Sequence, residues 1–360
     1  SQLEKFNLCR VSYFCNYGLN VRERQRAEIN PMQYGTIVHY ILERFFCEYT
    51  KEEYLSLEED KFQKIVCAYL AEYAVKYFGE EQLESNSFTY RLKTILDNVM
   101  YLMKHIMEEL SQSEFFVADC ELKIGEDIPS YTIVLPDGHK IAVCGSVDRV
   151  DIMQRADITY LRIIDYKTGT KQFKLSDILY GINLQMLLYL HSIEASGGDK
   201  YGEIVPAGIL YMPATVPYIS SDSLKSIDKL PDELNKKLKM NGLLLKDTEI
   251  IHGMDKTDVA TYIPVKIKAG EPVSSTSLAT LAEFGKIFKK VDMLIAEMGK
   301  NIYNGNIEAK PLKGGHDSCE YCPYDSVCAY RQSNPITCFS VDNKTVIEEI
   351  TNEINGKEEE

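Results

Sequence analysis

The chain has 360 residues, of which 45% are hydrophobic, so it can form one large domain or two ordinary ones around a substantial core. No apolar run is long enough to cross a bilayer, and the first residues lack the plan of a signal peptide, so we expect a cytoplasmic protein with no membrane partner. The net charge of −14 argues against a surface that coats nucleic acid generally, but it allows a local basic groove.

Helical patterns occupy the first third of the chain. Asn30 as an N-cap and Pro31 in the first turn predict a helix whose apolar stripe continues to Phe46. Apolar pairs at helical spacing predict two further helices, at about 59–79 and 86–111.

Strand-like segments follow, and the Asp-Gly in the stretch 135–140 predicts a hairpin turn between two of them. There is no G-x-x-x-x-G-K-[ST] loop for phosphate, so we expect no ATP motor in this chain. We expect strands at 115–124, 130–135, 140–152, 159–167, 206–213 and 261–268, helices at about 176–195 and 277–303, and a charged, exposed insertion at 225–239.

The stretch LRIIDYKTG, residues 161–169, ends an apolar strand in two opposite charges. Strand side chains alternate between faces, so Asp165 and Lys167 share the face of Leu161 and emerge together at the rim of a core. A lone pair of this kind is usually an ion pair that caps a strand end, because short motifs have many accidental matches. Other residues have to decide between that interpretation and a catalytic one.

Asp148 lies one strand earlier, in the stretch CGSVDRVD, and a short hairpin-like connection separates it from Asp165. Two carboxylates on neighbouring strands can share one divalent cation, and Mg²⁺ suits oxygen ligands. A lysine beside such a metal can position an attacking water and offset charge on a phosphate. Taken alone, Asp148 could equally be an aspartate at the end of a hairpin.

Asp148 followed by Asp165-Tyr-Lys167 resembles the D…(D/E)-x-K motif of the PD-(D/E)xK nuclease superfamily. His39 in YGTIVHYILE resembles the G-x-x-x-H element of its RecB-like branch, in which the histidine is a metal ligand. Gln185 and Tyr189, four residues apart and therefore on one helix face, resemble the Q-x-x-x-Y element of the same branch. Each element alone has an ordinary structural interpretation, but four in the family's order make coincidence an unsatisfactory explanation.

Three cysteines near the end of the chain, in CEYCPYDSVC, have the spacing of a metal site. A structural zinc site is the general interpretation, and it needs a fourth ligand, for which His316 and Cys338 are candidates. The three cysteines are Cys319, Cys322 and Cys328.

The N-terminal stretch LEKFNLCRVSYFCNYGLNVRER is similar to the opening of AddB/RexB-type helicase–nuclease subunits. This resemblance implies that Cys9 joins the three late cysteines around a 4Fe–4S cluster, an all-thiolate arrangement. The chain departs from the family at Arg10, where proline is usual, and it lacks the family's helicase-like portion. The four thiolates alone do not distinguish an iron–sulfur cluster from zinc.

The resemblance implies a metal-dependent DNA nuclease of a bacterial recombination-repair helicase–nuclease, which receives a single strand from a motor and has an AddA-like partner subunit. Mg²⁺ or Mn²⁺ would be held by a histidine, two aspartates and one backbone carbonyl, and Lys167 would position the water. The implied ligands are His39, Asp148, Asp165 and the carbonyl of Tyr166, with Gln185 and Tyr189 orienting the DNA strand or the site wall and Glu121 as a weaker candidate.

Two alternatives remain at this stage: a free-standing iron–sulfur nuclease of the CRISPR-adaptation type, and a catalytically silent DNA-binding module. We expect an α/β, restriction-endonuclease-like fold with a mixed central sheet flanked by helices, whose N- and C-terminal segments the iron–sulfur cluster joins. DNA would bind in a small basic groove near Lys171 and Lys174. The expected parts of this single integrated domain are a helical part at 1–112, the nuclease core at 113–270, a helix and cysteine segment at 271–345 and an acidic tail at 346–360.

Overall fold

The computed structural model describes residues 2–22, 31–79, 85–169, 171–219, 230–268, 271–272, 276–328, 330 and 335–358. Its centre is a six-stranded mixed sheet in the order β1-β4-β5-β6-β7-β10. The strands are β1 (Phe116–Ile124), β4 (Gly145–Arg155), β5 (Ile158–Lys167), β6 (Glu203–Pro213), β7 (Asn241–Leu245) and β10 (Leu278–Ala279). The expected α/β architecture with a mixed central sheet is therefore confirmed.

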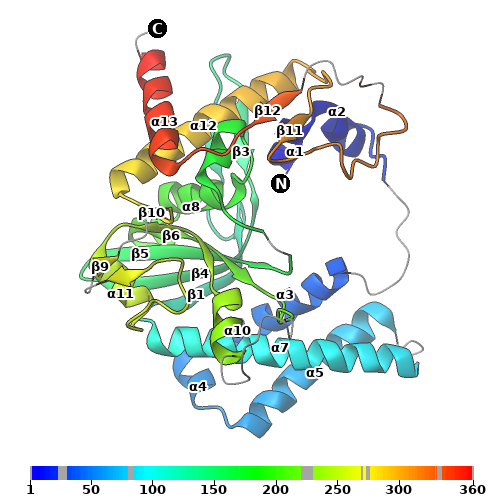
Figure 1. Ribbon diagram of the computed structural model, residues 1–360, viewed down its shortest axis with the longest axis vertical. Coiled ribbons are helices and arrows are strands. Elements are labelled where there is room, and N and C mark those ends of the chain that lie inside the picture. Colours follow the sequence, from blue (N-terminus) through cyan, green and yellow to red (C-terminus); the bar gives the residue numbers. More distant parts are fainter. Residues whose placement is uncertain are drawn as a thin grey trace.

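Helices cover both faces of this sheet (Figure 1). On one side lie α3 (Pro31–Glu48), α4 (Lys51–Leu55), α5 (Glu59–Phe78) and α7 (Asn86–Gln112), and on the other α8 (Gln185–Ser196), α12 (Leu281–Tyr303) and α13 (Asn343–Glu358). The helices α1 (Gln2–Leu8) and α2 (Arg10–Tyr13) lie beside β11 (Leu312–Gly314) and β12 (Ile336–Cys338), from the other end of the chain. The remaining elements are η1 (Phe14–Gly18), β2 (Tyr131–Val134), β3 (Lys140–Val143), η2 (Leu175–Tyr180), α9 (Gly198–Tyr201), α10 (Leu230–Leu238), α11 (Thr248–Met254), β8 (Ile267–Lys268) and β9 (Glu271–Pro272).

The strands β4 and β5 form an antiparallel hairpin in the middle of the sheet, with Arg149 opposite Ile164. The next pairing, between β5 and β6, is parallel, because α8 and α9 return the chain to the same edge. Leu161, Ile163 and Ile164 are fully buried, as expected for a strand with helices on both faces. The apolar half of β5 thus lies in the core, and its charged end comes out at the rim.

Several sequence predictions are confirmed. The helices expected at 59–79 and 86–111 are α5 and α7, and the Asp-Gly turn connects β2 to β3.

The segment 346–360 is not the solvated acidic tail that we expected. Its residues up to Glu358 belong to α13, whose Val346, Ile350 and Ile354 are buried in the main core. In the described part of the chain, no helix is long and apolar enough to cross a membrane.

Other predictions were wrong in detail. The strand expected at 140–152 is two strands, β3 and β4, which separate at Cys144. The helix expected from about 176 begins as the short 3₁₀ turn η2, and α8 starts only at Gln185, because Gly181 and Asn183 take positive φ values of 67° and 55° between them. Only two residues of the segment 261–268 are in a strand, because the carboxylate of Asp255 accepts the backbone N–H of Tyr262 and curls the chain.

Three further expectations concern segment ends. The capping box of α12 places Thr280 at its N-cap, so the helix expected from 277 begins at Leu281. Part of the charged insertion is the helix α10, whereas its residues 225–229 lie outside the described residues. The predicted N-cap Asn30 also lies outside them.

Candidate functional site

The hairpin of β4 and β5 brings Asp148 and Asp165 together at the rim of the sheet. Asp148 is tied to the neighbouring strand, because its Oδ2 accepts the backbone N–H of Tyr166 at 2.9 Å. Burial, and next the charge of Asp165, raise the pKa of Asp148 well above that of an ordinary aspartate. The electrostatic repulsion between these two carboxylates is relieved when one of them takes up a proton or when a cation binds beside them.

His39 reaches this pair from α3. Its Nδ1 lies 3.5 Å from Oδ2 of Asp148 and 3.7 Å from Oε1 of Glu121, and its Nε2 lies 3.1 Å from the carbonyl oxygen of Tyr166. Burial lowers the pKa of His39, but the hydrogen bond to Glu121 and the charge of Asp148 outweigh burial, so the pKa is raised overall. The histidine therefore lies in a strongly negative pocket.

Glu121 joins the site through an unusual backbone conformation of β1. It has a φ of 49°, and it lies between the paired residues Cys120 and Leu122, so it faces Asp148 on β4. Ser146 donates a 2.6 Å hydrogen bond to Oε2 of Glu121. Sequence patterns offered only weak grounds for including Glu121, since a positive φ in a strand has no local sequence signal.

These residues form one candidate metal centre. Among the described residues, His39, Glu121 and Asp148 are the only group of three whose ligand atoms all lie within 4.8 Å of one another. One imidazole nitrogen and two carboxylates, with the carbonyl of Tyr166 beside them, form a donor set that suits Mn²⁺ and, through its oxygens, Mg²⁺. The residues present therefore fit a divalent cation.

Asp165 and Lys167 lie next to this centre rather than inside that group of three. The ammonium of Lys167 forms an ion pair with Oδ2 of Asp165, as expected for two opposite charges at the end of a strand. The side chain of Asp165 is 8% exposed and that of Lys167 is 30% exposed, so the lysine head reaches solvent at the site. The structure thus places the ammonium of Lys167 beside the metal centre, where a phosphate could contact both the ammonium and a bound metal ion.

Gln185 and Tyr189 lie on the first turns of α8 and face the start of β4. A Cβ on Gly145 would lie only 2.2 Å from the hydroxyl oxygen of Tyr189, so glycine is needed there for the ring to fit. Burial raises the pKa of Tyr189, a hydrogen bond from Gln185 opposes that shift, and the charge of Asp148 adds to it. The two predicted side chains therefore contact each other at the wall of the site.

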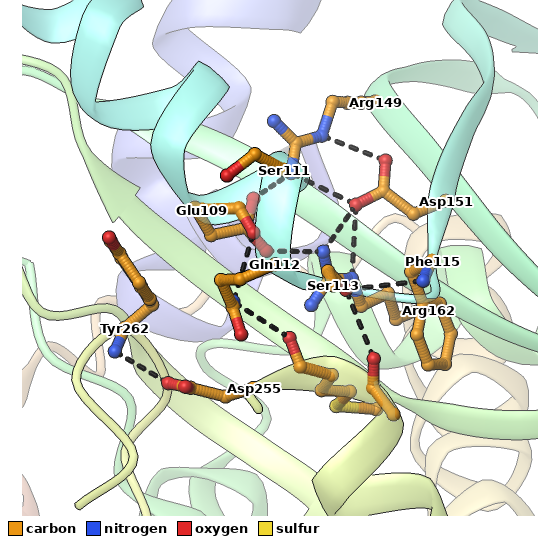
Figure 2. Close-up of polar contacts among 12 residues, drawn as sticks. Glu109, Ser111, Gln112, Ser113, Phe115, Arg149, Asp151, Arg162, Asp255 and Tyr262 are labelled. Atoms are coloured by element: carbon orange, nitrogen blue, oxygen red, sulfur yellow. Dashed lines mark hydrogen bonds and ion pairs between the residues drawn. The ribbon is translucent and has the colours of Figure 1, made fainter. Parts of the chain in front are cut away.

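Below the site lies a cluster of four buried charges, drawn in Figure 2. Arg149 and Arg162 point toward Glu109 and Asp151, and all four side chains are 0% exposed. Arg149 also donates a 3.2 Å hydrogen bond to the hydroxyl of Tyr166, whose backbone contacts both His39 and Asp148. The cluster thus fixes the strands directly beneath the candidate metal centre.

A second candidate site is a cavity of about 110 Å³ between the N-terminal residues 9–12 and the segment 309–330. Cys9, Cys319, Cys322 and Cys328 all line it. Cys9 is 8% exposed, and burial raises its pKa. The structure brings the early cysteine to the late three, although more than three hundred residues separate them along the chain.

The two other candidates for the fourth ligand lie elsewhere. Cys338 packs in a small apolar cluster with Ile182 and Leu312, and His316 points its Nε2 at Asp177, 3.3 Å away. Neither residue lines the cavity of the four cysteines.

The expected basic groove is only partly exposed. Lys174 is exposed, whereas Lys171 is half-buried, with its ammonium 4.9 Å from the centre of the Tyr211 ring. Burial lowers the pKa of Lys171. The two lysines do not make an extended basic surface.

Comparison with known proteins agrees with this geometry. The family model of the PD-(D/E)XK nuclease superfamily matches residues 1–329. An ATP-dependent helicase/deoxyribonuclease subunit of Thermoanaerobacter sp. (strain X514) is 34% identical over an alignment of 342 positions, gaps included, which covers 92% of this chain and 29% of that protein. The protein of the same name from Alkaliphilus oremlandii is 33% identical over an alignment of 370 positions, gaps included, which covers 98% of this chain and 32% of the relative. The chain thus spans about a third of the length of the curated relatives it matches.

Proposed function

The chain belongs to the PD-(D/E)XK nuclease superfamily, and from this premise we propose that it is the metal-dependent DNA nuclease part of a helicase–nuclease subunit. The observation that carries the proposal is the convergence of His39, Glu121 and Asp148 beside the pair of Asp165 and Lys167. A silent binding module has no need of a complete set of such groups. The substrate would be a DNA single strand delivered by a motor.

The metal would be Mg²⁺ or Mn²⁺, held by His39, Asp148, Glu121, the carbonyl of Tyr166 and Asp165. When bound, such an ion lowers the pKa of a water and polarises a phosphoryl oxygen. Lys167 would hold the attacking water and offset negative charge on the phosphate, and Asp165 would orient the lysine through their ion pair. Gln185 and Tyr189 would orient the DNA strand against the wall of the site.

The four thiols around the second cavity would hold a 4Fe–4S cluster. Support comes from the single cavity that all four cysteines line and from the all-thiolate donor set, which is the usual ligand set of such a cluster. The catalytic strands hold none of these cysteines, so the cluster would be structural.

The curated relatives are named as subunits of an ATP-dependent helicase/deoxyribonuclease. We therefore infer a role in repair of DNA double-strand breaks and in recombination, in the cytoplasm, with an AddA-like helicase–nuclease subunit as partner. The four parts expected from the sequence would work as one nuclease domain. A free-standing nuclease of the CRISPR-adaptation type is disfavoured by the extent of similarity to these longer relatives.

Digestion of an end-labelled single strand by the purified chain, with and without Mg²⁺ or Mn²⁺, tests the function. Asp165→Ala and Lys167→Ala are expected to remain folded and to lose about 10²-fold or more in rate, because each removes a group that acts on the reacting phosphate. Lys64→Ala, which changes an exposed lysine on α5 that is neither in the metal centre nor in the expected basic groove, is the matched control. Near-normal cleavage by either folded variant would contradict the assignment. A visible absorbance band of anaerobically purified protein separates iron–sulfur from colourless zinc.

A further inference from the structure

The helix α8, which carries Gln185 and Tyr189, begins without a cap of its own. Its N-cap residue Leu184 has no side chain that can accept a hydrogen bond. Instead, the backbone N–H of Gln185 donates to Oε1 of Glu4 at 3.0 Å, across 181 residues of sequence. A carboxylate there satisfies one of the free N–H groups of the first turn and lies at the positive end of the helix dipole. The cap of α8 is therefore supplied by α1.

The same helix α1 also holds the turn that leads into α8. Asn7 donates a 3.2 Å hydrogen bond from its Nδ2 to the carbonyl oxygen of Gly181. Gly181 has a φ of 67°, and a Cβ there would lie 1.7 Å from Nδ2 of Asn7. Only glycine fits this close approach, so the start of α8 is fixed by two contacts from α1.

The segment 316–339 contacts the same turn before α8 at residues 177 and 180. His316 lies 3.3 Å from the carboxylate of Asp177, and the backbone N–H of Phe339 donates to the hydroxyl of Tyr180 at 3.0 Å. Both residues come from the C-terminal segment that also contains Cys319, just as α1 directly precedes Cys9. The two segments that meet at the cysteine cavity thus also meet around residues 177–185.

We propose that Glu4 is a positioning residue, which caps α8 and so couples the cysteine cavity to the wall of the active site. This inference rests on the proposed nuclease function. Removal of Glu4 releases the first turn of α8 and lets Gln185 and Tyr189 move away from Asp148, with the metal ligands themselves intact. Loss of whatever joins the four cysteines frees α1 and releases the same turn.

Amide hydrogen exchange tests the coupling without any activity measurement. In Glu4→Ala, exchange at residues 185–188 accelerates, whereas exchange in β4 and β5 and the iron content are unchanged. Glu4→Gln keeps an oxygen acceptor and exchanges nearly as slowly as the unaltered chain, and Gln2→Ala, an exposed position on α1, is the matched control. Cys9→Ala accelerates exchange in the same four residues.

Several results would overturn the proposal: unchanged exchange at 185–188 in Glu4→Ala, equal acceleration throughout the sheet, loss of iron from Glu4→Ala, or no effect of Cys9→Ala on this turn. If Glu4→Ala does not fold, Glu4→Asp takes its place, because its carboxylate is one methylene too short to reach Gln185. Each measurement then supports or contradicts the coupling directly.

Kinetics tests the consequence for catalysis. Glu4→Ala lowers kcat by about tenfold or more, the loss expected for one charge-assisted hydrogen bond, and leaves the Mn²⁺ concentration for half-maximal rate unchanged. In the double variant Gln185→Ala/Tyr189→Phe, the addition of Glu4→Ala causes no further loss, since it acts through these side chains. If Glu4→Ala lowers kcat in the double variant by the same factor as in the unaltered chain, the proposal is overturned. If the unaltered chain and Asp165→Ala are equally inactive, the nuclease function fails, and hydrogen exchange still decides the role of Glu4.

Discussion

Neutralising Glu109 should destabilise the protein far more than neutralising a surface carboxylate. Glu109 accepts from Arg162 at 2.6 Å and from Arg149 at 3.3 Å, and all the side chains involved are 0% exposed. Glu109→Gln keeps the shape but leaves two buried guanidinium groups with Asp151 as their remaining carboxylate. Breaking a buried pair by removing one partner costs about 3–5 kcal/mol, because the other charge stays desolvated.

The expected change in melting temperature follows from the size of the chain. Unfolding entropies of about 2.1 cal/(mol·K) per residue convert this cost to a fall in Tm of about 4–7 °C for 360 residues. Thermal unfolding followed by circular dichroism, at neutral pH and constant salt, measures it. Glu348→Gln is the matched control, since its pair with Lys344 is exposed and should contribute about 1 kcal/mol or less.

A double variant tests the reason for the effect. Glu109→Leu/Arg162→Leu removes one charge of each sign, so it should be less destabilised than Glu109→Gln, although it changes two buried residues. A Tm of Glu109→Gln within about 1 °C of the unaltered chain would refute the argument, because it would mean that the guanidinium groups are not desolvated. A double variant as unstable as the sum of its parts would show that shape, not charge balance, dominates.

Four other outcomes are expected. Burial lowers the pKa of His191, but the hydrogen bonds of His191 to carboxylates outweigh burial and raise the pKa to about 9. The contribution of His191 to stability is therefore complete below about pH 6.5 and is lost as the pH rises through about 9. The difference in Tm between the chain and His191→Gln should shrink over that range; a constant difference would contradict it. Gly145→Ala should slow cleavage with little change in Tm, because a methyl group displaces the tyrosine packed there; an unchanged rate would show that this tyrosine is not needed in place. Cys9→Ala should lose iron and fall sharply in Tm, whereas Cys338→Ala should keep its iron; the reverse pattern, measured as iron per chain, would exclude a site that joins both chain ends. Single-strand binding should have a shallow dependence on salt, as expected for few phosphate contacts, and a steep slope would reveal an extended basic surface.

Local patterns in the sequence predicted the central part of the site. The alternation of side chains in a strand places Asp165 and Lys167 on one face at the end of β5, and the structure has them as an ion pair. The hairpin between β4 and β5 is short, so the neighbouring position of Asp148 was also predictable. The roles assigned to His39, Gln185 and Tyr189 depended on family resemblance, since a histidine or glutamine on a helix has no local feature that indicates a site.

Patterns failed where a side chain from outside the segment binds one of its backbone groups. The segment 261–268 alternates like a strand, yet Asp255 takes the N–H of Tyr262 and the segment curls, while Ile263 and Val265 still enter the core. Periodicity reports which side chains are buried, but it does not report which partner a backbone N–H finds. The start of α8 was misplaced because Gly181 and Asn183 take positive φ values before it. The cap of α8 also comes from Glu4 rather than from a neighbouring residue.

The sequence by itself thus determined the order of strands and helices, the two charged residues at the end of β5 and the grouping of the three late cysteines, because each depends on residues close together in the chain. Only the tertiary structure decided that Glu121 faces Asp148 and that Glu109 lies between two buried arginines. The meeting of Cys9 with the late cysteines was expected from family resemblance alone, and the folded chain brings them to one cavity. These contacts join residues that are tens to hundreds of positions apart. Their formation depends on strand register, on a positive φ and on the packing of whole helices, which are properties of the folded chain rather than of any short segment.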